Sequence, residues 1–129
     1  MTLEQIIEAL RTRPRFAPQF TAWHTIPERA AHYEPFPSDL DARLVQALGR
    51  TGITQLYSHQ AEAYGIVRGG SDAVVVTPTA SGKTLCYNLP VLDTVLRDPQ
   101  ARALYLFPTK ALGADQVDEL QTLIGLLGA

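Results

Sequence analysis

The segment from Ala73 to Thr84, A-V-V-V-T-P-T-A-S-G-K-T, constrains the fold of this chain more than any other feature. Its first five residues form a short apolar, β-branched run, which is typical of a strand buried on both faces. A polar turn follows, and Gly82-Lys83-Thr84 begins a stretch with helical periodicity. A strand, a turn and a helix that starts with G-K-T are typical of a phosphate-binding loop. The segment therefore predicts an α/β fold with a nucleotide site.

The residues of this turn suit a phosphate group for separate physical reasons. Free backbone N–H groups at a helix N-terminus, together with the helix dipole, stabilise an anion. Gly82 lets the backbone approach closely, Lys83 can bridge the β- and γ-phosphates, and Thr84 can offer a hydroxyl to Mg²⁺. The strict pattern G-x-x-x-x-G-K-[ST] would place a glycine at Thr77, so the match is incomplete. The alternative is a strand–turn–helix in which G-K-T occurs by chance.

Further apolar periodicity predicts how the rest of the chain is organised. Arg102 to Phe107 predicts a second strand. A strand, a helix, a strand and a helix in succession imply parallel strands joined by a right-handed crossover. Because sheets usually contain about 4–6 strands, we expect the parallel sheet to be incomplete in this chain. Helices are predicted over residues 2–11, from 38 or 39 to 49 or 52, over 60–67, from 82 to before 99, and from 110 onward.

The first helix, the segment that follows it and the last helix carry more detailed predictions. Thr2 and Gln5 have the spacing of a capping box at the start of the first helix. Residues 13–37 hold five of the nine prolines and five aromatic residues, so we expect an extended arm that packs on a larger body. We divide the chain into this N-terminal helix and arm, residues 1–37, and an α/β part, residues 38–129. The last helix is expected to bury a face that comprises Ala114, Val117, Leu120 and Ile124.

Composition limits the classes of protein to consider. The chain has 129 residues, of which 46% are hydrophobic and 19% charged, a profile typical of a globular chain. No apolar run is long enough to span a membrane, no secretory signal is visible, and the single Cys86 permits no internal disulfide. A cytoplasmic location is therefore the expectation. The net charge of −2 neither indicates nor excludes a nucleic-acid partner, because a local phosphate-binding strip needs only a few basic groups.

Two motifs on either side of the loop complete a family pattern. L-Y-S-H-Q stands at residues 56–60 and F-P-T-K-A-L at 107–112. With V-T-P-T-A-S-G-K-T at 76–84, the chain resembles the superfamily 2 helicases of the DEAD/DEAH-box kind, and within them the bacterial mitomycin repair factor A type. The phosphate loop of that family commonly lacks the leading glycine, so the resemblance accounts for Thr77. It covers the chain from about Trp23 to Leu120 and implies the N-terminal part of a RecA-like P-loop NTPase domain.

The resemblance assigns nucleotide-binding roles to individual residues. Gln60 would read adenine, because its amide can accept from the exocyclic amine and donate to the ring nitrogen. Tyr57 would stack on the base, with simple packing as the alternative. Lys83 would be the catalytic residue, and Thr84 would hold Mg²⁺ through its hydroxyl. The complete ATP-binding set implied by the resemblance is Tyr57, Gln60, Thr79, Ala80, Ser81, Gly82, Lys83 and Thr84.

Thr109 and Lys110 resemble the motif with which this family contacts one nucleic-acid strand. Pro108 ends the predicted strand there, and the N-terminus of the next helix, a hydroxyl and an ammonium together suit a phosphate. The alternative is a helix cap followed by a solvated lysine. The implied partner is single-stranded or partly duplex DNA.

Parts that the family needs for hydrolysis are not recognisable in the sequence. Hydrolysis requires an acidic segment that holds Mg²⁺, and no D-E-x-H sequence occurs. A second RecA-like domain and a C-terminal zinc-binding region are likewise not recognisable. We therefore expect the first part of an ATP-dependent DNA helicase, implied to act in repair, truncated or with its remainder on a separate chain. On its own it should bind nucleotide weakly at most and not turn it over. The alternative is a non-catalytic binding or regulatory piece that docks on a partner chain.

Overall fold

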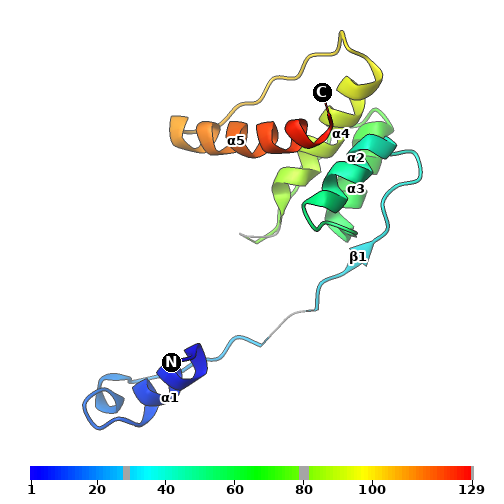
Figure 1. Ribbon diagram of the computed structural model, residues 1–129. Coiled ribbons are helices and arrows are strands. Elements are labelled where there is room, and N and C mark those ends of the chain that lie inside the picture. The colour runs from blue at the N-terminus through cyan, green and yellow to red at the C-terminus, as the bar shows by residue number, and fades with distance from the viewer. Residues whose placement is uncertain (28–29, 79–81, 129) are drawn as a thin grey trace. The chain divides into compact units, whose positions relative to one another are not determined.

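A computed structural model describes residues 1–27, 30–78 and 82–128 of the chain (Figure 1). The described residues form two compact units, Met1–Ala30 and Ala31–Ala129. No helix in these ranges is both long and apolar enough to cross a membrane. The elements, in chain order, are α1 (Leu3–Thr12), the 3₁₀ turn η1 (Ala17–Gln19), β1 (Tyr33–Glu34), α2 (Ala42–Arg50), β2 (Leu56–Tyr57), α3 (Ser58–Arg68), α4 (Lys83–Arg97) and α5 (Lys110–Leu126).

The first unit contains α1 and part of the proline- and aromatic-rich segment. The predicted capping box is confirmed: Gln5 N donates to Thr2 Oγ1 at 3.4 Å, and Thr2 N donates to Gln5 Oε1 at 2.9 Å. Beyond η1 the aromatic residues pack within this unit. Phe20 and Trp23 meet edge to face with ring centroids 5.3 Å apart, and the Arg11 guanidinium lies 5.4 Å from the Trp23 ring centre.

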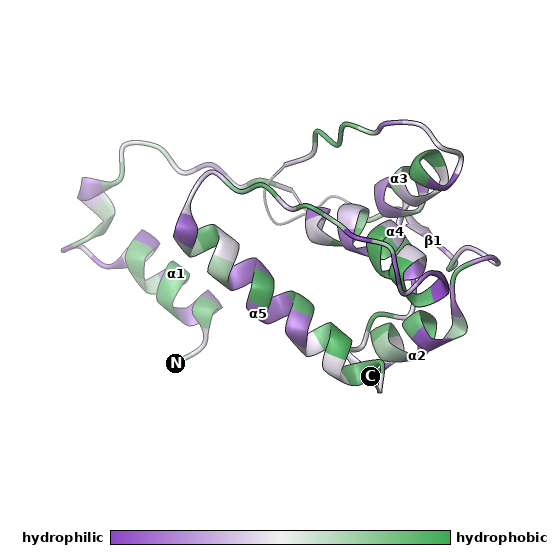
Figure 2. Cartoon of the chain, turned by 90° about the horizontal axis from the view of Figure 1, so that it is seen from above, coloured by the Kyte–Doolittle hydropathy of each residue, from purple (hydrophilic) through white to green (hydrophobic). Residues whose placement is uncertain are grey.

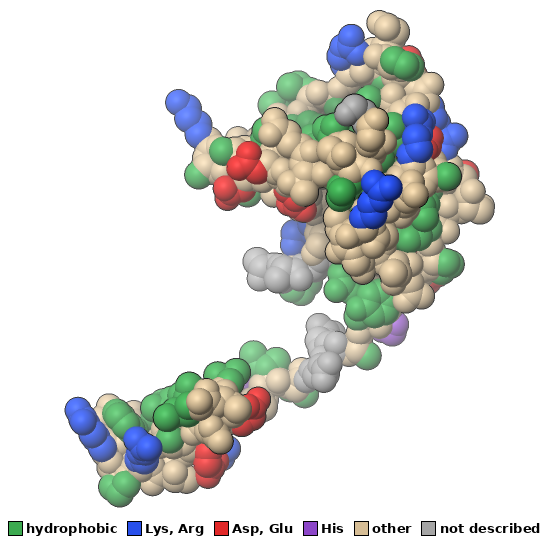
Figure 3. All heavy atoms as spheres, viewed as in Figure 1, with side chains coloured by type: hydrophobic (Ala, Val, Ile, Leu, Met, Phe, Trp, Pro, Cys, Tyr) green, Lys and Arg blue, Asp and Glu red, His purple; other side chains and the backbone are tan. Residues whose placement is uncertain are grey.

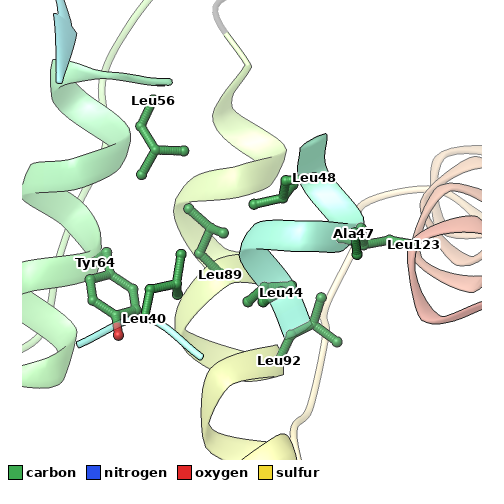
Figure 4. Close-up of a cluster of buried hydrophobic side chains, with 9 residues drawn as sticks. All are labelled: Leu40, Leu44, Ala47, Leu48, Leu56, Tyr64, Leu89, Leu92 and Leu123. Atoms are coloured by element: carbon green, nitrogen blue, oxygen red, sulfur yellow. The ribbon is translucent and has the colours of Figure 1, made fainter. Parts of the chain in front are cut away.

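The core of the second unit is made mainly by α2, α3 and α4 (Figure 4). α2 begins later than predicted, because a turn in which Leu40 N donates to Pro37 O precedes it and Asp41 caps the helix by accepting from Arg43 N. Burying a leucine side chain contributes about 1.5–3 kcal/mol, so this cluster holds the helices together. Its members are Leu40, Leu44, Ala47, Leu48, Leu56, Tyr64, Leu89, Leu92 and Leu123.

The sheet differs from the prediction. The described strands form a two-stranded antiparallel ladder, with Tyr33 opposite Tyr57 and Glu34 opposite Leu56. The predicted parallel strands at 73–77 and 102–107 are extended but are not strands in the described residues. Val74 and Val76 are 90% and 89% exposed, and Leu104 and Leu106 are 85% and 82% exposed. Strands are stabilised by pairing with a neighbour. These segments instead contribute Ala73, Val75 and Phe107 to the lining of a cavity of about 630 Å³ that α3, α4 and α5 also line.

α5 begins at Lys110 as predicted, but it buries a different face. Val117 and Ile124 are exposed, whereas the side chains turned inward are those of Gln116, Leu120 and Leu123. Figure 2 shows the alternation of apolar and polar residues along this helix. The helix is attached by Leu123 in the core and by Arg50, whose Nη1 donates to Leu126 O at 3.2 Å. These contacts fix the rotation of α5 about its own axis. The inward face predicted from apolar periodicity alone is displaced by about one residue from the observed one.

A buried carboxylate joins three parts of the second unit. Asp93 on α4 is fully buried, and its Oδ1 accepts from the backbone N–H of Asp41 at 2.9 Å. Arg97 donates to both carboxylate oxygens, through Nε at 2.9 Å and Nη2 at 3.0 Å. Tyr64 Oη of α3 lies 3.2 Å from Oδ2. The network therefore ties the start of α2 to α3 and α4.

Candidate nucleotide-binding site

Gly82 has the backbone conformation that starts α4. Its φ of 70° and ψ of 30° lie in the left-handed region, which glycine adopts at little cost. A Cβ atom at this position would lie 2.6 Å from Gln60 Nε2 and 3.6 Å from the Tyr57 ring. The backbone conformation therefore favours glycine here, and a Cβ would push the Gln60 amide away from its present position.

Lys83 is the first residue of α4, and its side chain reaches Thr77 and Pro78. Its Nζ donates to Thr77 O at 3.0 Å and to Pro78 O at 2.8 Å. The ammonium therefore lies at the carboxyl end of the extended segment 73–78, next to the start of the helix. Thr79, Ala80 and Ser81, which belong to the predicted ATP-binding set, lie outside the described residues.

Gln60 links the L-Y-S-H-Q segment to the start of α4. The side chain is 2% exposed; its Oε1 accepts from Tyr57 N at 2.9 Å, and its Nε2 donates to Gly82 O at 2.8 Å. A primary amide has two acceptor and two donor positions, so one of each is used by these bonds. The buried amide thus holds two backbone segments and retains hydrogen-bonding capacity for a ligand.

Tyr57 belongs to a stack of three rings that the sequence did not indicate. Tyr33 of β1 lies on it with ring centroids 5.1 Å apart, and His59 lies 5.6 Å away and nearly parallel. Tyr33 is held there by the β1–β2 pairing. In the sequence, Tyr33 is one of the five aromatic residues of the 13–37 arm, and nothing in that pattern distinguished it from the other four.

A cavity of about 770 Å³ brings several predicted residues together. Tyr57, Gln60, Gly82 and Thr84 line it, and Tyr33, Asn88 and Glu119 contribute to it without having been predicted. Thr84 is half-buried and also lines the 630 Å³ cavity, which Lys83 lines as well. Cys86, two residues after Thr84 on α4, is buried, and burial raises the pKa of its thiol.

The predicted DNA-contacting pair lies at the start of α5. Thr109 is the N-cap, and its Oγ1 accepts from Leu112 N at 3.2 Å. Lys110 is the first residue of the helix and is exposed. The capping role that was the alternative for Thr109 is therefore present, and the cap leaves the helix N-terminus and Lys110 on the surface.

Gly82→Ala should lower nucleotide affinity by about tenfold or more, because the new Cβ displaces Gln60 from Gly82 O and left-handed backbone costs an alanine about 1–2 kcal/mol. Gly70→Ala is the matched control: Gly70 has a φ of 82° but no atom within 4 Å of a Cβ. Titration with a fluorescent ATP analogue measures both variants. Equal affinities for the two variants would contradict the role given to the Gln60–Gly82 contact.

The match to known proteins agrees with this geometry. A model of the DEAD/DEAH box helicases matches residues 57–129, which is more than half of the chain and includes Gln60, the phosphate loop and the start of α5. The chain belongs to the DEAD/DEAH box helicase family. The resemblance found at L-Y-S-H-Q, P-T-A-S-G-K-T and F-P-T-K-A-L is thus confirmed at the level of the family.

Several helicases are similar over most of this chain. The ATP-dependent helicase YprA of Bacillus subtilis is 53% identical over 106 residues, which are 82% of this chain and 14% of YprA. The ATP-dependent helicase HRQ1 of Saccharomyces cerevisiae is 37% identical over 89% of this chain and 10% of HRQ1. The crystal structure of the DUF1998 helicase MrfA bound to DNA and AMPPNP matches with a TM-score of 0.87 and 46% identity, over all of this chain and 18% of that one. The chain therefore spans less than a fifth of each of these relatives.

Proposed function

We propose that the chain is the ATP- and DNA-binding part of an ATP-dependent DNA helicase. The contact between Gln60 and Gly82 carries this proposal, because an amide that could read adenine is held beside the start of α4 and at the same cavity. The structural relative bound to DNA and AMPPNP supports it. A role in DNA repair, implied by the resemblance to mitomycin repair factor A, is part of the proposal.

The residues at the cavity suit adenine. Adenine offers a donor at its exocyclic amine and an acceptor at the neighbouring ring nitrogen. Gln60 has one acceptor and one donor position beyond its bonds to Tyr57 N and Gly82 O. It can therefore pair with adenine without releasing the loop. The stacked rings of Tyr33 and Tyr57 line the same cavity and form an aromatic wall against which a base can pack.

The start of α4 suits the phosphates and Mg²⁺ of ATP. The N–H groups of its first turn and the helix dipole attract an anion. The Lys83 ammonium, which lies on two carbonyls of the turn, would transfer to the phosphates, and the Thr84 hydroxyl would serve as a Mg²⁺ ligand. Bound Mg²⁺ would supply charge neutralisation, whereas the chain's own residues bind and orient the nucleotide. Because no D-E-x-H sequence is present, we expect a polypeptide of these 129 residues to bind ATP without turnover.

DNA binding is assigned to the N-terminal end of α5. Thr109 and Lys110 lie there, and a helix N-terminus attracts backbone phosphates. Further along α5 the charges are acidic, at Asp115, Asp118 and Glu119 (Figure 3). Their repulsion of phosphate would confine a strand to the first turn of the helix.

A second candidate function is docking on a partner chain, such as the remainder of a helicase. The observation in its favour is the exposed apolar row of Val74, Val76, Leu104 and Leu106 on the two extended segments. Exposed apolar surface of this kind is typical of interaction sites. Under this alternative the chain would bind a partner but would show no selectivity for ATP.

Competition between ATP and GTP tests the proposed function. We expect the wild-type chain to prefer ATP by about tenfold or more, because a paired amide discriminates bases by about 1–3 kcal/mol. Gln60→Glu should abolish this preference, since its carboxylate keeps the acceptor for Tyr57 N but loses the donor. Gln55→Glu, an exposed residue that lines the same cavity, is the control for added charge. A wild-type chain that binds ATP and GTP equally would contradict adenine reading by Gln60.

A further inference from the structure

The N-terminal half of α5 is held differently from its C-terminal half. The C-terminal half enters the core through Leu123 and is bonded to α2 through Arg50. The N-terminal half extends away from the bundle of α2, α3 and α4 (Figure 1), and Leu112 and Val117 on it are exposed. The first turn of α5, with Thr109 and Lys110, therefore needs other contacts to keep its position.

Two tyrosines provide these contacts. Tyr87 of α4 donates from its Oη to Gln116 Oε1 of α5 at 2.5 Å. Tyr105, in the extended segment before α5, donates from its Oη to Asn88 Oδ1 of α4 at 3.0 Å, and Asn88 is buried. The two tyrosine rings also meet edge to face with centroids 5.8 Å apart. Two side-chain hydrogen bonds and a ring contact thus join α4 to both sides of the Thr109–Lys110 corner.

The residues of these two hydrogen bonds lie close in sequence to the phosphate loop on one side and to Thr109 and Lys110 on the other. Tyr87 lies one helical turn after Lys83, and Asn88 follows it. On the other side, Tyr105 stands four residues before Thr109, and Gln116 stands six residues after Lys110. The ring of Phe107 stacks on Tyr105 with centroids 6.2 Å apart, and it lies 3.6 Å from the point where a Cβ of Gly113 would be. The corner between the extended segment and α5 is therefore packed against the helix that begins at the phosphate loop.

We propose that Tyr87 and Tyr105, through Gln116 and Asn88, are positioning residues that fix the DNA-contacting corner relative to the phosphate loop. The inference rests on the proposed function, because it assumes that Thr109 and Lys110 contact DNA. Segment 102–107 is not in a ladder among the described residues, so side-chain contacts rather than sheet hydrogen bonds hold it on α4. Loosening the Tyr87–Gln116 bond frees the corner while the core and the hydrogen bond between Gln60 and Gly82 O stay in place.

The test measures DNA affinity and nucleotide affinity separately on the 129-residue chain. Tyr87→Phe removes the hydroxyl and keeps the ring, and Gln116→Leu removes the acceptor at similar size. Fluorescence anisotropy with labelled oligo-dT reports DNA binding, a fluorescent ATP analogue reports nucleotide binding, and thermal melting reports stability. Gln116→Glu restores an acceptor for Tyr87. Gln121→Leu and Gln121→Glu, at an exposed position of the same helix, match the two changes in size and charge.

We expect Tyr87→Phe and Gln116→Leu to weaken oligo-dT binding about three- to tenfold, the range for one hydrogen bond, with nucleotide affinity unchanged within about twofold. Gln116→Glu should bind DNA as well as Gln121→Glu does. An unchanged DNA affinity, or an equal fall in DNA and nucleotide affinity, would overturn the positioning role. A wild-type chain that binds nucleotide but not oligo-dT would instead overturn DNA binding in the proposed function, and the inference with it.

Discussion

Asp93→Ala is expected to lower the free energy of unfolding by about 3 kcal/mol, at the lower end of the range for breaking a buried ion pair. The carboxylate is fully buried and accepts hydrogen bonds from Asp41 N, Tyr64 Oη and Arg97. Its removal leaves the N–H and the hydroxyl without this acceptor, whereas Arg97 is partly exposed and can turn to water. Urea unfolding at pH 7 measures the loss.

The matched control is Asp115→Ala, which removes an exposed carboxylate from α5 and should change stability by less than about 0.5 kcal/mol. Equal stabilities of the Asp93→Ala variant and the wild-type chain would contradict the structural role of the network. Such a result would mean that the start of α2 is held on α3 and α4 by the leucine core alone.

The same carboxylate gives the stability a pH dependence. Burial by itself raises the pKa of Asp93, but the hydrogen bonds from Arg97 and from Asp41 N, with the Arg97 charge, outweigh it and lower the pKa below its usual value. The folded state therefore favours the ionised form, and its contribution is fully present above the unfolded pKa of about 3.9. It is lost as the pH falls through the lower folded pKa. The stability difference between the wild-type chain and Asp93→Ala should shrink below about pH 4.

Lys83→Ala is expected to reduce the affinity for ATP by roughly 10- to 100-fold, because a hydrogen bond to a charged group contributes about 1.5–3 kcal/mol. The ammonium lies on Thr77 O and Pro78 O, next to the helix N-terminus where phosphate is expected. Both hydrogen bonds are to carbonyls of exposed or half-buried residues, so the substitution should change the stability of the folded chain little. The sequence has one other lysine, Lys110, which makes Lys110→Ala a matched control. That variant should keep its ATP affinity and lose affinity for oligo-dT.

Helices and the family could be predicted from the sequence because their signals are local. The capping box at Thr2, the glycine that ends α3 and the G-K-T that starts α4 each act within one or two turns of the chain. The family motifs at residues 56–60, 78–84 and 107–112 are also contiguous, and the family match agrees with them. The proximity of Gln60 and Gly82 followed from the family pattern and not from local periodicity.

Features that depend on distant partners could not be predicted in the same way. The β1–β2 ladder joins two-residue strands that are 22 residues apart between Glu34 and Leu56 and too short for a periodic signal. Which face of α5 is buried depends on its contacts with Tyr87, Arg50 and the core around Leu123. The apolar pattern of the helix alone was therefore insufficient to predict that face. Residues 73–77 have the composition of a buried strand, but composition does not supply the neighbours that a strand requires.

Titration of the 129-residue chain with AMPPNP and Mg²⁺ tests the account most directly, because it asks whether the residues around Gly82 form an ATP site. Isothermal calorimetry of the wild-type chain should give one saturable site per chain. Lys83→Ala should weaken that site by roughly 10- to 100-fold, and Lys110→Ala should leave it unchanged. A wild-type chain that fails to saturate at millimolar nucleotide, or a Lys83→Ala chain that binds as tightly as wild type, would contradict the assignment of an ATP site at the start of α4.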